Sequence, residues 1–106
     1  MKNKINKDYM TGLYNRRYFF EVGKKIYEEN KKLNKTISIA ILDIDKFKKI
    51  NDTYGHSIGD FAIKEVARVL TENIMSSTLI SRIGGEEFCL LFYNRDKEEI
   101  EQKLRI

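Results

Sequence analysis

Two short acidic segments of this 106-residue sequence hold the residue types that could carry out chemistry. An Asp-Ile-Asp segment at residues 43–45 closes an apolar run, and a Gly-Gly-Glu-Glu segment at residues 84–87 separates two others. Mg²⁺ prefers carboxylate and carbonyl oxygens, and it takes one or two from the protein while waters and phosphates complete its octahedron. If the fold brings Asp43 and Glu86 together, they form a candidate Mg²⁺ site, with the backbone carbonyl of Ile44 beside them.

Each of these residues also has a simpler interpretation. Asp45 is expected to be the N-cap of the helix that follows it, since aspartate is among the preferred N-cap residues. Asp43 and Glu86 could be an exposed pair at a sheet edge. Lys48 lies about one turn into the next predicted helix, where its ammonium group could meet a phosphate.

Gly84 and Gly85 form a hairpin signal between two apolar segments, and a tight hairpin turn uses glycines for positive φ angles. Such a turn does not require two acids directly after it. Glycines also let a backbone approach a phosphate closely, because no Cβ intervenes. A solvated tight turn is the alternative.

The elements that must position these residues follow from periodicity and from helix start and stop signals. Asn15 is expected to cap a helix over residues 16–33, and a strand is predicted over residues 36–43. That strand is nearly all apolar at its end, which favours a central place in a sheet. The apolar stripe of the helix is Phe19, Val22, Ile26 and Leu33.

Two further helices are predicted after the first strand. The first covers residues 45–54 and is stopped by Gly55, and the second covers residues 57–75. Ser57 and Asp60 fit a capping box at the start of the second. Strands at 78–83 and 87–93 and a last helix over 96–106 follow. The second helix carries an apolar stripe of Ile58, Ala62, Val66, Leu70 and Ile74.

The order strand, helix, strand, strand, helix indicates an α/β (α+β) fold, a ferredoxin-like antiparallel sheet with helices whose last strand is missing. In that topology the first strand lies between the third and the fourth. Its end therefore meets the hairpin that joins the second and third strands. This arrangement places Asp43 beside Glu86.

Length and composition indicate one domain, 1–106, without a membrane segment or signal peptide. The single Cys89 excludes an intrachain disulfide and a thiolate cluster, and its apolar surroundings predict a packed thiol in a reducing, cytoplasmic compartment. The net charge is +4, and most lysines of the basic first half suit the wet face of a helix. No nucleic-acid partner is therefore expected.

Three segments together resemble the GGDEF domain, the catalytic module of diguanylate cyclases, which has a nucleotidyl-cyclase type palm. They are the entry motif at residues 8–17, the segment DIDKFKKINDTYGHSIGD at residues 43–60, and the signature RIGGEEF at residues 82–88. The signature has the GGEEF form. The resemblance spans essentially the whole chain.

The resemblance implies a set of roles for these residues. Asp43, the Ile44 carbonyl and Glu86 would bind two Mg²⁺ ions, with Mn²⁺ as a substitute. Glu86 would accept the proton of the GTP 3′-hydroxyl with help from Glu87, and Lys48 would stabilise the transition state. The implied substrate contacts are Asn51, His56, Asp60, Gly84 and Gly85, of which Asn51 and Asp60 would read guanine.

The implied reaction condenses two GTP into cyclic di-GMP and two pyrophosphates in a homodimer, with any sensor domain outside this chain. The chain departs from the family where the inhibitory Arg-x-x-Asp motif would lie, because residues 75–78 read Met-Ser-Ser-Thr. It is also expected to be incomplete at its C-terminus, where the family continues with its last strand and triphosphate-binding residues. The alternatives are an inactive GTP-binding or dimerisation module and a related cyclase that uses another nucleotide.

Overall fold

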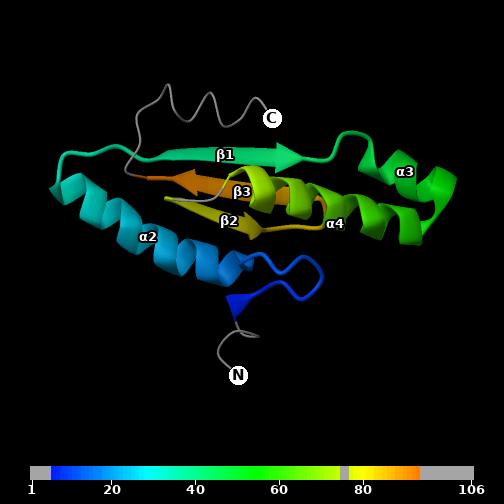
Figure 1. Cartoon of the computed structure of the whole chain (residues 1–106), viewed down its shortest axis with the longest axis horizontal. Helices are drawn as coiled ribbons and strands as arrows, with labels where there is room; N and C mark the ends of the chain where they lie inside the picture. The colour runs from blue at the N-terminus through cyan, green and yellow to red at the C-terminus, as the bar shows by residue number, and fades with distance from the viewer. Residues whose placement is uncertain (1–5, 75–76, 94–106) are drawn as a thin grey trace.

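The computed structural model describes residues 6–74 and 77–93, and its centre is a three-stranded antiparallel sheet (Figure 1). The strands are β1 (Ser38–Asp43), β2 (Thr78–Arg82) and β3 (Glu87–Phe92), in the order β1-β3-β2. The predicted α/β class and the pairing of the first strand with the third are confirmed. All three strands lie within one or two residues of their predicted bounds.

β3 is the central strand, and both of its faces are buried. Alternate side chains point to opposite faces of a sheet. Phe88, Leu90 and Phe92 pack on one side, in the cluster that includes helix α4. Cys89 and Leu91 pack on the other side, in the cluster that includes helix α2. The sheet therefore has a helix against each face.

β1 lies at an edge of the described sheet, as expected for a sheet that lacks its last strand, although the apolar sequence of the strand favoured a central place. It pairs with β3 alone among the described strands. Its side chains alternate between half-buried and exposed, and Ile39 and Ile41 are 56% and 66% exposed. Although this strand is apolar in sequence, one of its two faces is exposed among the described residues.

Helix α2 (Arg16–Lys32) begins where the sequence predicts. The Asn15 side chain accepts a hydrogen bond of 2.9 Å from the backbone N–H of Tyr18, so the predicted N-cap is confirmed. Phe19 of the predicted stripe is buried, but Leu33 lies past the helix end and is 66% exposed. The apolar stripe on the helix therefore ends at Ile26, about two turns before its predicted end.

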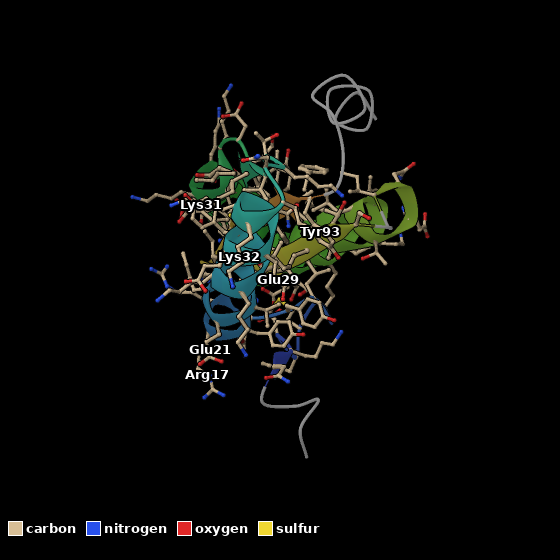
Figure 2. The ribbon with its side chains drawn as sticks, turned by 90° about the vertical axis from the view of Figure 1, so that its left-hand side faces the viewer. Arg17, Glu21, Glu29, Lys31, Lys32 and Tyr93 are labelled. Atoms are coloured by element: carbon tan, nitrogen blue, oxygen red, sulfur yellow. The ribbon has the colours of Figure 1, made fainter. Side chains whose placement is uncertain are left out.

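The charged face of α2 points away from the sheet, as Figure 2 shows for Arg17, Glu21 and Lys32. Arg17 and Glu21 form an exposed ion pair of 3.6 Å. Exposed pairs of this kind contribute little to stability. The predicted solvated face is confirmed for these residues.

Helix α3 (Phe47–Tyr54) is joined to helix α4 (His56–Asn73) through Gly55 alone. Gly55 has φ of +91°, a conformation that L side chains rarely adopt, so glycine is needed here for the sharp turn. Neither helix has a side-chain cap. The predicted cap by Asp45 is wrong, because Lys46 occupies the N-cap position with a left-handed backbone.

The predicted capping box of Ser57 and Asp60 is also wrong, because α4 begins one residue earlier than predicted and places Ser57 inside the helix. The predicted buried face is confirmed for Leu70 and Ile74, but in the first part of α4 it is shifted by one residue. The predicted Ile58 is 48% exposed. The buried residues of α4 are Gly59, Ile63, Ala67 and Leu70.

The predicted last helix, 96–106, lies outside the described residues, and so does Met75, the predicted end of α4. Within residues 6–74 and 77–93, no helix has the length and apolar character needed to cross a membrane.

Candidate functional site

The two acidic segments meet at one rim of the sheet, where β1 ends and the β2–β3 hairpin turns (Figure 1). Asp43 pairs with Glu87 in the register of the two strands. The next residue, Ile44, donates a backbone hydrogen bond of 3.2 Å to the carbonyl of Glu86. The two segments predicted to converge are therefore joined by the last step of the β1–β3 ladder, although the direct partner of Asp43 is Glu87.

The rim offers hard oxygen ligands to a cation. Asp43 and Glu87 are exposed and Glu86 is half-buried. The carbonyl of Ile44 accepts a hydrogen bond of 3.3 Å from the N–H of Phe47, and a carbonyl oxygen has a second lone pair. In the described ranges no group of three His, Cys, Asp or Glu side chains forms a closed metal site. An open site with few protein oxygens fits Mg²⁺, which keeps waters and binds substrate phosphates.

The hairpin is closed by backbone hydrogen bonds from Ile83 and Gly84 to the carbonyl of Glu87, at 3.0 and 3.4 Å. The predicted reason for its two glycines is wrong, since neither has a positive φ. A Cβ on Gly84 would lie 2.9 Å from Oε1 of Glu87, the flexible end of an exposed side chain that can move aside. Around Gly85 a Cβ would meet nothing within 4 Å, so its surroundings are open.

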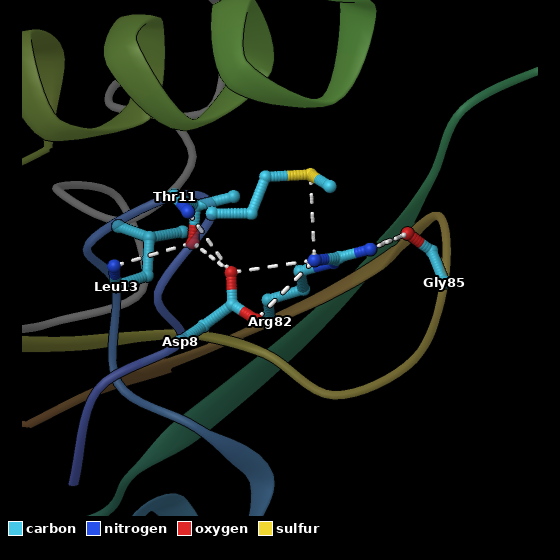
Figure 3. A network of polar contacts seen from close by, with 6 residues as sticks. Asp8, Thr11, Leu13, Arg82 and Gly85 are labelled. Atoms are coloured by element: carbon cyan, nitrogen blue, oxygen red, sulfur yellow. Dashed lines mark hydrogen bonds and ion pairs between the residues drawn. The ribbon is translucent and has the colours of Figure 1, made fainter. Parts of the chain in front are cut away.

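The side chain of Arg82 binds the backbone of this hairpin, a role that was not predicted from the sequence (Figure 3). Its Nε and Nη2 donate to the carbonyl of Gly85 at 3.2 and 2.9 Å. Its Nη1 lies 3.2 Å from Oδ1 of Asp8. The side chains of Arg82 and Asp8 are only 16% and 19% exposed, so solvent screens this ion pair less than a surface pair.

Asp8 is itself fixed by a local turn (Figure 3). Its Oδ2 accepts hydrogen bonds from the backbone N–H and the hydroxyl of Thr11, at 3.0 and 2.7 Å. The Thr11 hydroxyl in turn accepts from the N–H of Leu13 at 3.2 Å. An Asp followed three residues later by Thr is a signal for such a turn. The entry motif is thus connected to the signature hairpin through Arg82.

The same N-terminal segment lies along the outer edge of β2. Tyr14 donates a backbone hydrogen bond to Ile80 at 3.3 Å and accepts one from Arg82 at 3.0 Å. These bonds cover part of an edge that would otherwise present unpaired backbone groups.

The remaining predicted site residues lie on α3 and α4. Lys48 is exposed on the first turn of α3, and His56 and Asp60 are exposed on the first turns of α4. Asn51 is half-buried, and its Oδ1 is buried with no hydrogen-bond partner among the described residues. This side chain packs against Gly59, which directly precedes Asp60.

A cavity of about 500 Å³ lies elsewhere and opens between α2 and β1. Its lining is mainly apolar, and it shares no residue with the rim: Phe19, Phe20, Gly23, Lys24, Tyr27, Ile37, Ile39 and Leu91. Cys89 is also remote from the chemistry, since it is buried under α2 and burial raises the pKa of its thiol. The predicted packed thiol is confirmed.

A comparison with protein families places these observations among known proteins. The family model described as "Diguanylate cyclase, GGDEF domain" matches residues 5–106. The chain is 40% identical over 98 residues to the probable diguanylate cyclase DgcT of Escherichia coli, and 33% identical over 98 residues to its diguanylate cyclase DosC. Each match covers 92% of this chain and 21% of the relative. The chain therefore spans about a fifth of the length of these relatives.

Solved structures agree with this match. A Caulobacter crescentus structure of the coiled coil and GGDEF domain of DgcB, in complex with c-di-GMP, is 32% identical with a TM-score of 0.92. It covers 97% of this chain and 54% of that chain. Diguanylate cyclase SiaD of Pseudomonas aeruginosa, in complex with its activator SiaC, is 35% identical with a TM-score of 0.91, over 97% of this chain and 40% of that one.

Proposed function

Because the chain belongs to the diguanylate cyclase GGDEF domain family, we propose that it forms the catalytic part of an enzyme that condenses two GTP into cyclic di-GMP and two pyrophosphates. The observation that carries this proposal is the rim where Asp43 meets the hairpin of Glu86 and Glu87. At this rim the acidic groups that phosphoryl transfer from GTP requires lie at the ends of adjacent strands.

The base of GTP is read between α3 and the first turns of α4. Guanine presents an acceptor at its 6-oxo group and donors at its ring N–H and amino group. The amide of Asn51 donates to the acceptor, and the carboxylate of Asp60 accepts from the donors. Adenine reverses this pattern, which leaves polar groups mismatched and disfavours ATP. Gly84 and Gly85 leave space beside the phosphates, and His56 contributes a further contact.

The transfer itself occurs at the rim. Glu86 accepts the proton of the 3′-hydroxyl as its oxygen attacks the α-phosphorus, and the bond from that phosphorus to the pyrophosphate breaks. Glu87 assists, and the ammonium of Lys48 offsets the negative charge that develops. Asp43, Glu86 and the Ile44 carbonyl would hold Mg²⁺ or Mn²⁺, which supplies positive charge at the α-phosphate and lowers the pKa of the attacking hydroxyl.

The product has two equivalent phosphodiester bonds, and each domain is proposed to hold one GTP. Two copies must therefore face one another, with each 3′-hydroxyl aimed at the α-phosphate of the other nucleotide. We propose a homodimer as the active species, placed in the cytoplasm where GTP is available, under the control of a sensor outside residues 1–106.

The test is incubation of the protein with GTP and Mg²⁺, followed by chromatography of the nucleotides. Cyclic di-GMP and pyrophosphate are expected from the protein, and neither is expected from a Glu86→Gln variant. GTP that binds without conversion would support the alternative of a GTP-binding or dimerisation module. Equal conversion by the Glu86→Gln variant would contradict the assignment of the rim.

A further inference from the structure

Asn51 of α3 contacts Gly59 of α4 at the proposed base pocket. A Cβ built on Gly59 would overlap Oδ1 of Asn51 and would lie 2.9 Å from its Cγ. It would also lie 3.3 Å from Cζ of Phe47. Gly59 and the amide oxygen of Asn51 are both buried.

Backbone conformation does not explain this glycine. Gly59 lies inside α4 with an ordinary helical backbone, where alanine is the better helix former. The reason must therefore be space. Gly23, the buried glycine of α2, differs in this respect, because a Cβ there would meet only the flexible end of Leu91 at 3.3 Å.

We propose that Gly59 is a positioning residue that determines base specificity. Its missing side chain lets the Asn51 amide lie flat against α4 with Oδ1 inward. The Nδ2 end is then the one available to donate to the 6-oxo group of guanine, beside the carboxylate of Asp60. This inference rests on the proposed function for the identity of the base, but the packing argument stands on the structure alone.

The first experiment tests the packing and needs no nucleotide. Thermal unfolding is measured for Gly59→Ala, Asn51→Ala and the double variant, because a double-mutant cycle isolates the interaction of the two sites. Gly59→Ala should lower the melting temperature when Asn51 is present. In the Asn51→Ala background the same change should be neutral or stabilising, since the overlap is gone and alanine favours the helix. An equal loss in both backgrounds would overturn the proposal.

Gly23→Ala is the matched control for this cycle. It also adds a methyl group to a buried helical glycine, but its contact is with Leu91 in the other cluster. Its effect on the melting temperature should be the same with and without Asn51. A dependence on Asn51 as large as that of Gly59→Ala would mean that the cycle does not report a direct contact, and would overturn the proposal.

The second experiment measures affinities for GTP, inosine triphosphate and ATP by calorimetry. Loss of one hydrogen bond to the base should weaken binding roughly fivefold to tenfold. Gly59→Ala and Asn51→Ala should both show this loss with GTP and with inosine triphosphate, which keeps the 6-oxo group. Neither should change the affinity for ATP, which lacks that group. A merely structural effect would weaken all three nucleotides alike and would overturn the proposal.

The two possible failures are distinguishable. If Asn51→Ala lowers the affinity for GTP while Gly59→Ala does not, the positioning role of Gly59 is wrong and the base pocket stands. If neither variant changes the affinity for GTP, the base pocket is wrong, and the role of Gly59 in specificity falls with it.

Discussion

Replacement of Arg82 by methionine tests whether the entry motif supports the catalytic rim. The change keeps much of the side-chain volume but removes the cation and its three hydrogen-bonded nitrogens. Asp8 then remains mostly buried with only the Thr11 donors, and the carbonyl of Gly85 loses two donors. Both consequences act on the hairpin that carries Glu86.

The magnitude follows from the burial of the pair. Removal of one partner of a buried ion pair costs about 3–5 kcal/mol, whereas exposed pairs contribute about 0–1 kcal/mol. The side chains of Arg82 and Asp8 are 16% and 19% exposed, so the pair lies near the buried limit but keeps some screening. We therefore expect the free energy of unfolding to fall by about 2–3 kcal/mol. That is a large part of the roughly 5–15 kcal/mol typical of native domains.

The assay is equilibrium unfolding in urea, with cyclase activity measured on the folded fraction. Arg68→Met is the matched control, since Arg68 joins Glu65 and Glu72 on the exposed face of α4 and is 52% exposed. This control should change stability little and should leave activity intact. Equal destabilisation by the two variants, or full activity of Arg82→Met, would refute the reasoning.

Four further predictions concern the metal site, the cap of α2, the buried thiol and the sequence of residues 75–78. Asp43→Asn should abolish turnover while the circular dichroism spectrum stays native, as expected for Glu86→Gln, and a rate within a few-fold of the original would contradict the metal-site assignment. Asn15→Ala should lower the free energy of unfolding by about 1 kcal/mol, since it removes the side-chain cap of α2. An unchanged urea midpoint would show that this cap does not stabilise the protein. Cys89 should react with iodoacetamide only on unfolding, because burial raises the pKa of its thiol. For the same reason the free energy of unfolding should decline as the pH rises from the thiol pKa of the unfolded state toward that of the folded state. Cyclic di-GMP should not inhibit through residues 75–78, and chemical-shift changes centred there on titration would show otherwise.

Local signals in the sequence predicted much of this fold. Asn15 as a cap, the three strands and the meeting of Asp43 with the signature hairpin all follow from patterns within short windows and from one topology. The start of α4 could not be predicted in this way, because Gly55 forms the link between two helices directly and leaves Ser57 no capping role. The first buried residue of α4 is Gly59, which packs against Asn51 of α3, and a periodicity of apolar residues does not report a buried glycine.

The residues that bind the hairpin in place were harder to predict than the acidic residues of the rim. Arg82 and Asp8 are separated by 74 positions, and an Arg before a hairpin has no local reason to be buried. Only the three-dimensional path of the entry segment along β2 brings them together. Similarly, the two glycines of the hairpin predicted positive φ angles, which the hairpin does not use.

The strand order has a consequence for how the protein folds as it is made. β1 and β2 each pair with β3 and not with one another, so no ladder of the described sheet can form before residues 87–92 are available. Until then the apolar faces of α2 and α4 that pack against β3 in the folded protein stay uncovered. Because sheet pairing over long sequence separations is slow, we expect a late, cooperative collapse onto β3 during synthesis. The catalytic rim would be assembled in that same step, so that a partly synthesised chain could not hold its acidic residues in place.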